Sequence, residues 1–286
     1  MTRRRIPFVS LTPGEDSHSV REAIERVIER GWFVLGPEVE QFEVQFAAAA
    51  GASHAIGVGN GTDALALILR ALGIGPGDEV ITTSLSAAYT ALAISMTGAT
   101  PVFADVDPVR LTIDPDSIAA VVRPRTRAIL PVHLYGQAAD MLPIERLASR
   151  HNLAIVEDCC QAHLATANGR PVGTIGHAGA FSFIQRRISA RWAMAAAVIT
   201  NDRSLAEKVK RLRNGGRSTG TIIRNEESIL DWMTSKRPSW ERSFLASRLD
   251  RTTSSARRQL PGSARGICRR CTPRVRYRSR LSLVRD

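Results

Sequence analysis

The chain has 286 residues, 44% of them hydrophobic, which is enough for a sizeable core in one large domain or two ordinary ones. It has no apolar run of roughly 18 residues and no long apolar stretch after its basic N-terminus, so we expect a cytoplasmic protein without a membrane span. Most of the net charge of +12 comes from residues 241–286, where 13 Arg oppose three acidic residues, so residues 1–240 lack the charge of a nucleic-acid-binding protein.

Residues 16–240 are predicted to alternate helices with short strands. Apolar residues at helical spacing predict helices in SVREAIERVIER and VEQFEVQFAAAA, each followed by a glycine as a stop signal. The strand HAIGVG then leads through the turn NGTD into a third helix. Apolar runs rich in β-branched residues predict the strands DEVITTS, TPVFADVD, TRAILPVHLYG and LAIVEDCC. Between them, helices are predicted in SAAYTALAISMTG and DMLPIERLASRHN.

This alternation predicts an α/β fold. Strands that are apolar on both faces, with helices between them, favour a mostly parallel sheet flanked by helices. Such sheets bind ligands beyond the carboxyl ends of their strands, so the residues that follow each strand are the candidates for chemistry. They are GNGTD (59–63), TTSLS (82–86), HLYGQ (133–137), EDCCQAH (157–163) and Ser182 with Phe183.

Two of these strand ends carry a chemical signal, and each has a structural alternative. Residues 59–62 open a helix, where free backbone N–H groups and the helix dipole can hold a phosphate, although such a glycine-rich turn can also be purely structural. Asp158 ends an apolar strand, where a carboxylate is costly unless it meets a cation. Its alternatives are a helix cap or a buried ion pair.

The cysteines predict neither a disulfide nor a metal site. Cys159 and Cys160 are adjacent, so on a strand they point to opposite faces and rarely bridge. Cys268 and Cys271 form a single CxxC, which is a weak metal signal without a second pair.

Taken in order, stretches of residues 6–217 resemble the sugar aminotransferases of the DegT/DnrJ/EryC1/StrS family. They are IPFVSL, GWFVLGPEVEQFE, GNGTDALALIL, GATPVFADVDP, PVHLYGQ, IVEDCCQAH, GRPVGTIGHAGAFSF and RLRNGG. The resemblance implies the pyridoxal-phosphate-dependent transferase fold, with residues 1–225 as its large domain. It also implies an aminotransferase that acts on a nucleotide-linked keto sugar with an amino-acid donor, in polysaccharide or amino-sugar biosynthesis, and an intact parent that is a homodimer.

The resemblance implies roles for single residues as well. Gly61 and Thr62 would bind the phosphate of pyridoxal 5'-phosphate at the helix N-terminus, with the Ser182 hydroxyl as a further donor. Asp158 would pair with the pyridinium nitrogen and keep it protonated, which makes the ring an electron sink. Gln161 would lie near the phenolic oxygen of the ring.

Two further positions are less defined by the resemblance. His163 follows in the family's QAH pattern, and a structural role suits it at least as well as a functional one. Where the family often has an aromatic residue that stacks on the pyridine ring, this chain has Ala87, with Tyr89 close by.

Residues 184–196, IQRRISARWAMAA, depart from the family. The family places there a segment like YPTKNLGALGDGG, whose Lys forms the Schiff base with the cofactor, and the aligned residue here is Arg187. Arginine stays protonated and cannot supply the neutral amine that this bond needs. We therefore expect no covalent attachment of the cofactor and no transamination by this chain.

A pair of compensating frameshifts is our hypothesis for this departure. When the last base of each codon from Phe183 onward is read with the first two bases of the next codon, the segment can spell YPTKNLGALGDGG. The same operation on SILDWMTSKRPSWERSFLA can spell NSRLDDLQAAVLGAKLPRL, which is close to what the family places after RNGG. Residues 226–286 are therefore expected to be an out-of-frame, poorly ordered Arg-rich tail, and the family's small C-terminal domain is expected to be missing.

Two alternatives stay open at this point. The chain could be a genuine homologue without the lysine, whose basic tail binds nucleic acid or a protein partner; against this, Tyr277 is the only aromatic residue among the Arg after residue 245. Some relatives use a His at the lysine position to dehydrate sugars, and Arg187 does not supply that chemistry either. Neither a membrane nor nucleic acid is expected as a partner.

Overall fold

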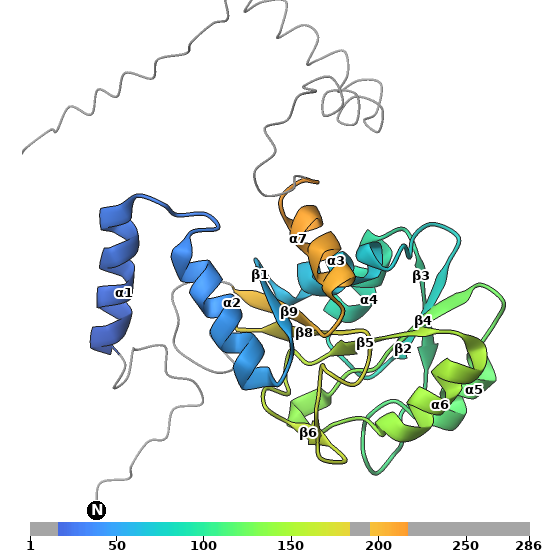
Figure 1. Cartoon of the computed structure of the whole chain (residues 1–286). Helices are drawn as coiled ribbons and strands as arrows, with labels where there is room; N and C mark the ends of the chain where they lie inside the picture. The colour runs from blue at the N-terminus through green and yellow to red at the C-terminus, as the bar shows by residue number, and fades with distance from the viewer. Residues whose placement is uncertain (1–16, 184–194, 217–286) are drawn as a thin grey trace, which may run out of the picture. The chain divides into compact units, whose positions relative to one another are not determined.

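The computed structural model describes residues 17–183 and 195–216 (Figure 1). The chain divides into two units, residues 1–221 and 222–286, and everything described below belongs to the first. Arg187, the expected Arg-rich tail and the CxxC of Cys268 and Cys271 lie outside the described residues. Within the described ranges, no helix combines the length and the apolar character that crossing a membrane requires.

A seven-stranded sheet forms the centre of the described structure, in the order β1-β9-β8-β5-β4-β2-β3. Its strands are β1 (His54–Val58), β2 (Glu79–Thr83), β3 (Thr100–Ala104), β4 (Thr126–Leu130), β5 (Ala154–Asp158), β8 (Ala178–Ser182) and β9 (Ala196–Thr200). The pairs from β3 through β8 are parallel, whereas β9 is antiparallel to both β8 and β1. This confirms the mostly parallel sheet. The sequence does not predict the reversal at β9, because an apolar strand pattern carries no direction.

Helices cover both faces of the sheet. They are α1 (Ser17–Arg30), α2 (Pro37–Ala50), α3 (Gly61–Ala71), α4 (Tyr89–Met96), α5 (Pro115–Val121), α6 (Met141–His151) and α7 (Arg203–Arg213), with a 3-10 turn, η1 (Leu134–Gly136). Buried side chains of α3, α4 and α7 form one apolar cluster with the strands, and those of α2, α5 and α6 form the other. Figure 1 shows α5 and α6 together on one side of the sheet and α3 with α7 on the other.

The alternation of side chains along the strands explains why both faces are apolar. In β5, Val156 belongs to the cluster on the α3–α4 face, and Ile155 belongs to the cluster on the α5–α6 face. Because successive side chains of a strand point to opposite faces, Asp158 falls on the α3–α4 face and Glu157 on the other. The two-residue period of the strand therefore decides that Asp158, and not Glu157, faces α3 and α4.

Local signals set the helix ends. Pro37 stands in the first turn of α2, where its missing N–H is not needed, and Gly51 ends this helix with a left-handed φ of 70°. Asn60 caps α3 by accepting a hydrogen bond from the Asp63 N–H. Helices α1, α2, α3, α4 and α6 were expected from the sequence. α5, α7 and the hairpin of β6 (Thr166–Ala167) and β7 (Arg170–Pro171) were not.

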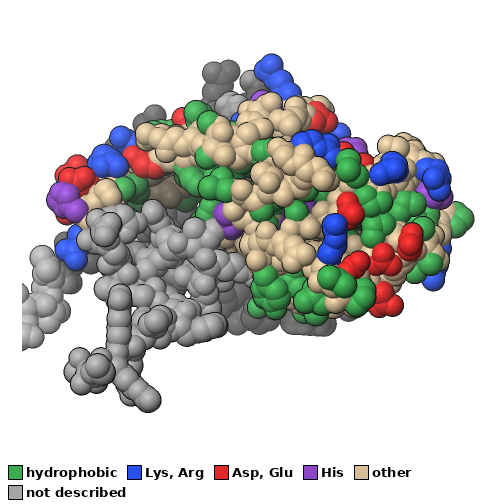
Figure 2. All heavy atoms as spheres, turned by 90° about the horizontal axis from the view of Figure 1, so that it is seen from below, with side chains coloured by type: hydrophobic (Ala, Val, Ile, Leu, Met, Phe, Trp, Pro, Cys, Tyr) green, Lys and Arg blue, Asp and Glu red, His purple; other side chains and the backbone are tan. Residues whose placement is uncertain are grey.

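The charges of the described surface are mixed. On the face seen in Figure 2, Lys and Arg side chains lie interspersed with Asp and Glu, without a field of one sign. Among the described residues, charged side chains also form ion pairs, such as Arg170 with Glu145. This agrees with a sequence in which the excess positive charge falls in residues 241–286.

Candidate functional site

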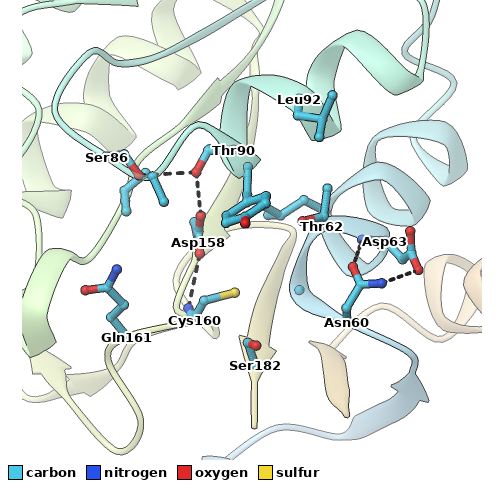
Figure 3. A pocket seen from close by; sticks show the side chains of 15 residues that line it. Asn60, Thr62, Asp63, Ser86, Thr90, Leu92, Asp158, Cys160, Gln161 and Ser182 are labelled. Atoms are coloured by element: carbon cyan, nitrogen blue, oxygen red, sulfur yellow. Dashed lines mark hydrogen bonds between the residues drawn. The ribbon is translucent and has the colours of Figure 1, made fainter. Parts of the chain in front are cut away.

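A cavity of about 380 Å³ opens where the carboxyl ends of β5 and β8 meet the first turns of α3 and α4 (Figure 3). Open α/β sheets bind their ligands at this edge, and the volume is in the range of small-molecule sites. The lining residues are Asn60, Gly61, Thr62, Asp63, Leu65, Ser86, Ala87, Tyr89, Thr90, Leu92, Val132, Asp158, Cys160, Gln161 and Ser182.

The first turn of α3 offers backbone donors to the cavity. Asn60 accepts a hydrogen bond from the backbone N–H of Asp63 (2.9 Å) and donates one from its side-chain amide to the Asp63 carboxylate (2.7 Å). The first N–H with an acceptor inside the helix is that of Ala64, which donates to the Asn60 carbonyl, so the helix itself cannot satisfy the N–H groups of Gly61 and Thr62. With the helix dipole and the Thr62 hydroxyl, they suit an anion such as a phosphate.

Close packing explains the glycine at position 61. A Cβ atom there would lie 2.6 Å from Sγ of Cys160 and 3.2 Å from Cβ of Ser182. Gly61 therefore allows the N-terminus of α3 to approach the ends of β5 and β8. As a result, Gly61, Thr62 and the Ser182 hydroxyl meet on one side of the cavity.

Asp158, the last residue of β5, is 6% exposed and is held from several directions. Oδ2 accepts a hydrogen bond from the Thr90 hydroxyl (2.8 Å), and Oδ1 accepts one from the Cys160 backbone N–H (3.1 Å). Its own backbone N–H donates to Pro131, and its carbonyl accepts from the N–H of His133. It forms no ion pair with another described residue. Its carboxylate can therefore accept a cationic N–H from a ligand in the cavity.

Gln161 lies below and to the left of Asp158 in Figure 3 and also lines the cavity. Its Oε1 accepts a hydrogen bond from the backbone N–H of Tyr135 (3.1 Å). Tyr135 has a left-handed backbone (φ 54°, ψ 26°), which is uncommon for a residue other than glycine and marks a position that its surroundings hold. Because the carbonyl end of Gln161 is engaged, its amide N–H groups are the donors that it can offer to an oxygen of a ligand.

On the opposite face of the sheet, Glu157 forms a buried polar cluster with His133 and Cys159. His133 accepts at Nδ1 from the backbone N–H of Ala139, so its Nε2 carries the proton and donates to Glu157 (3.0 Å). Three backbone N–H groups of residues 173–176 also donate to Glu157. Burial, and secondarily the charge of Glu157, raises the pKa of the Cys159 thiol well above its ordinary value.

The three side chains of this cluster are close enough together to hold a metal ion. A metal, however, needs a thiolate, a neutral imidazole nitrogen with a free lone pair, and free carboxylate lone pairs. Here both imidazole nitrogens are engaged in hydrogen bonds, and Glu157 already accepts four, so a metal ion would have to displace these contacts. The hydrogen bonds of the cluster join β5 to His133, in the segment that follows β4, and to residues 173–176 before β8.

Three other predicted positions can now be placed. His163 does not line the cavity; its ring packs against Phe181 and Phe183, with centroids 5.4 Å and 5.2 Å apart, a contact that fits the structural alternative. Ala87 and Tyr89, the two positions considered for ring stacking, both line it.

The structure brings the predicted cofactor-binding residues together. Gly61, Thr62, Asp158, Gln161 and Ser182 all line the one cavity, whereas the position of Arg187 lies outside the described residues. Ser86, Thr90 and Cys160 are among the lining residues that received no role from the sequence. Their only signal was position, because Ser86 ends the TTSLS segment after β2, Thr90 stands four residues later, and Cys160 lies within EDCCQAH.

Comparison with known proteins relates this site to a family. The profile of the DegT/DnrJ/EryC1/StrS aminotransferase family matches residues 15–230. Over 213 residues the chain is 46% identical to the dTDP-3-amino-3,6-dideoxy-alpha-D-galactopyranose transaminase of Aneurinibacillus thermoaerophilus, a match that covers 74% of this chain and 59% of that protein.

Solved structures of aminotransferases are also similar to this chain. DesV of S. venezuelae, in complex with a ketimine intermediate, has a TM-score of 0.74 and 45% identity, covering 77% of this chain and 60% of DesV. NtdA of Bacillus subtilis, with the bound cofactor PMP, has a TM-score of 0.71 and 31% identity, and the match covers 79% of this chain and 53% of NtdA. The chain thus spans between about half and three fifths of the length of these relatives. It belongs to the DegT/DnrJ/EryC1/StrS aminotransferase family, whose fold it shares and whose cofactor is pyridoxal phosphate.

Proposed function

We propose that the chain derives from a pyridoxal-phosphate-dependent aminotransferase of a nucleotide-linked keto sugar, with an amino acid as donor. The family membership and a relative named as a transaminase of a dTDP-linked amino sugar support this. The observation that supports it most directly is the cavity, which joins a helix N-terminus suited to phosphate with a buried carboxylate suited to a cation.

The donors and acceptors of the cavity fit the cofactor. The phosphate suits the α3 N-terminus at Gly61 and Thr62, with the hydroxyl of Ser182 beside it. A protonated ring nitrogen suits Asp158, and the phenolic oxygen suits the amide N–H groups of Gln161. When bound, pyridoxal phosphate supplies an electron sink for reactions at the carbon that carries the amino group.

The residues of the chain then have separate tasks. Asp158 holds a proton on the ring nitrogen, and its buried setting strengthens this charge pair because little water screens it. The α3 N-terminus anchors the phosphate end, so that the ring is fixed at two points. Gln161 orients the ring from its oxygen side. None of these contacts uses residues 184–194.

We further propose that this chain binds the cofactor only without a covalent bond and does not transaminate, because Arg187 stands at the lysine position. Pyridoxamine phosphate, which needs no lysine to bind, is the suitable probe. We expect saturable binding to the full chain in titration calorimetry, and no amino transfer to a nucleotide-linked keto sugar.

The matched variants are Asp158→Asn and Asp116→Asn. Asp158→Asn removes the charge opposite the ring nitrogen and should weaken pyridoxamine phosphate at least about tenfold, the effect expected for a hydrogen bond between charged groups. Asp116 is exposed in the first turn of α5 and does not line the cavity. The Asp116→Asn variant should therefore bind pyridoxamine phosphate as tightly as the unchanged chain. Absence of binding to the unchanged chain, or turnover by it, contradicts the proposal.

A pair of compensating frameshifts that brackets residues 184–196 is our proposed origin of Arg187, and a further loss of the reading frame near residue 225 is our proposed origin of the Arg-rich tail. The family profile matches only up to residue 230, which fits a reading frame lost near residue 225. On this proposal residues 226–286 are not a nucleic-acid-binding segment. Resequencing the gene tests it: DNA without an AAG triplet across codons 186 and 187 in the shifted frame excludes the idea. A chain expressed from the restored frame should bind pyridoxal phosphate covalently and transaminate.

A cytoplasmic homodimer is the proposed state of the intact parent. In α4, Tyr89, Leu92 and Met96 lie on one side of the helix and are 63%, 50% and 40% exposed. Tyr89 and Leu92 also line the cavity, so this apolar side borders its opening. Exposed apolar surface of this kind is typical of protein interfaces, and a second copy of the chain is the partner that we propose for it.

A further inference from the structure

Thr90 is the side-chain donor to Asp158. It is 2% exposed in the first turn of α4, and its hydroxyl lies 2.8 Å from Oδ2 of Asp158. Oγ of Ser86 lies 3.3 Å from Oγ1 of Thr90. Figure 3 shows Ser86, Thr90 and Asp158 as one continuous row of hydrogen-bonded groups.

The carboxylate fixes the direction of these hydrogen bonds. A carboxylate can only accept, so the Thr90 proton points to Asp158. The Thr90 oxygen is then left to accept, and the Ser86 hydroxyl must be its donor. Hydrogen bonds that run in one direction polarise one another, so Ser86 strengthens the contact that Thr90 makes.

Thr90 is the second residue of α4, so no carbonyl of its own helix lies one turn earlier for its hydroxyl to bond. Thr90 instead donates to a residue 68 positions away, at the end of β5. The contact thus ties the start of α4 to the carboxylate at the cavity.

We propose that Thr90, supported by Ser86, is a positioning residue that orients the Asp158 carboxylate toward the ring nitrogen of the cofactor; this rests on the proposed function. Thr90 engages Oδ2 and the Cys160 backbone N–H engages Oδ1, so both oxygens are fixed. Each oxygen keeps a further lone pair for the ring N–H. Such supporting hydrogen bonds are how proteins hold a charged group in its working geometry.

Thr90→Val tests the proposal, because it removes the hydroxyl and keeps the shape of the side chain. Thr90→Ser retains a hydroxyl. Thr82→Val is the matched control: Thr82 is equally buried, donates to the Leu130 carbonyl (2.9 Å) and does not line the cavity. The full chain and each variant are titrated with pyridoxamine phosphate and with its analogue in which C–H replaces the ring nitrogen. The ¹⁵N signal of ring-labelled pyridoxamine phosphate reports the protonation of that nitrogen.

Thr90→Val should weaken pyridoxamine phosphate about tenfold, as expected for a lost hydrogen bond to a charged group, and leave the affinity of the nitrogen-free analogue unchanged. It should also reduce protonation of the ring nitrogen, and Thr90→Ser should restore both properties. Equal weakening of both ligands, or no change in either readout, overturns the proposal while the proposed function stands. If the unchanged chain binds neither ligand, the proposed function fails and the role of Thr90 fails with it.

Discussion

Gly61 shows how a single residue decides whether α3 can meet the sheet. In Gly61→Ala the new methyl group would lie 2.6 Å from Sγ of Cys160, so either α3 or the Cys160 side chain must shift. We expect a loss of about 1–3 kcal/mol in the free energy of unfolding, measured by urea denaturation, and weaker binding of pyridoxamine phosphate.

Its neighbour Gly59 provides the control. A Cβ atom there meets nothing closer than 3.7 Å, so Gly59→Ala should change neither property appreciably. Adding Cys160→Ala to Gly61→Ala removes the sulfur and should recover part of the stability. Equal behaviour of the two glycine variants would contradict a packing requirement at position 61.

Single residues also mark the limit of what the sequence could predict about the site. Gly61 was predicted from the glycine-rich turn that opens a helix, and Asp158 was predicted from its place at the end of an apolar strand. Thr90 and Ser86 could not be found in this way, since a hydroxyl has no motif and the partner of Thr90 is 68 positions away. Only the folded sheet brings α4 to the end of β5.

At the level of elements, Glu157 joins β5 to the segment that follows β4 and to residues 173–176. In Glu157→Gln the amide can accept at one end, but its NH₂ end must face either two backbone N–H groups or the Nε2–H of His133 and a further N–H. His133 cannot change tautomer to relieve this, because its Nδ1 accepts from Ala139. We expect a loss of about 3–5 kcal/mol in the free energy of unfolding.

Denaturation of Glu207→Gln gives the reference for this measurement. Glu207 is exposed in α7, and its replacement should change the free energy of unfolding by no more than about 0.5 kcal/mol. If Glu157→Gln lowered the free energy of unfolding as little as this control, the hydrogen bonds of Glu157 would not be what holds these segments together.

The predicted elements were mostly right because periodicity reports burial directly. β2, β4 and β5 are apolar on both faces and lie inside the sheet, as their residues predict. The missed elements are short or polar: α5 has seven residues, and α7 carries Arg and Lys over most of its length. α5 is too short to show an apolar stripe, whereas in α7 Leu205, Val209 and Leu212 recur at helical spacing, so this helix could have been predicted from the sequence.

For the whole molecule, the exposed side of α4 predicts self-association of the intact parent. Met96→Glu places a charge on this side without touching the cavity lining. In the frame-restored protein it should shift sedimentation from dimer toward monomer, because burying an unpaired charge at an interface is costly. Leu142→Glu in α6, where Leu142 is 43% exposed, is the matched control and should leave the dimer intact. A dimer unaffected by Met96→Glu would place the interface elsewhere.

The strand order also has a consequence for folding during synthesis. The lining residues within the described part of the chain lie between positions 60 and 182, so a nascent chain that has reached residue 183 already holds all of these. β1, however, pairs in the described sheet only with β9, which ends at Thr200. Until β9 is synthesised, β1 has no strand partner and its edge is open to wrong pairing. Formation of the complete sheet therefore waits for residues that lie beyond the segment where this chain departs from its family.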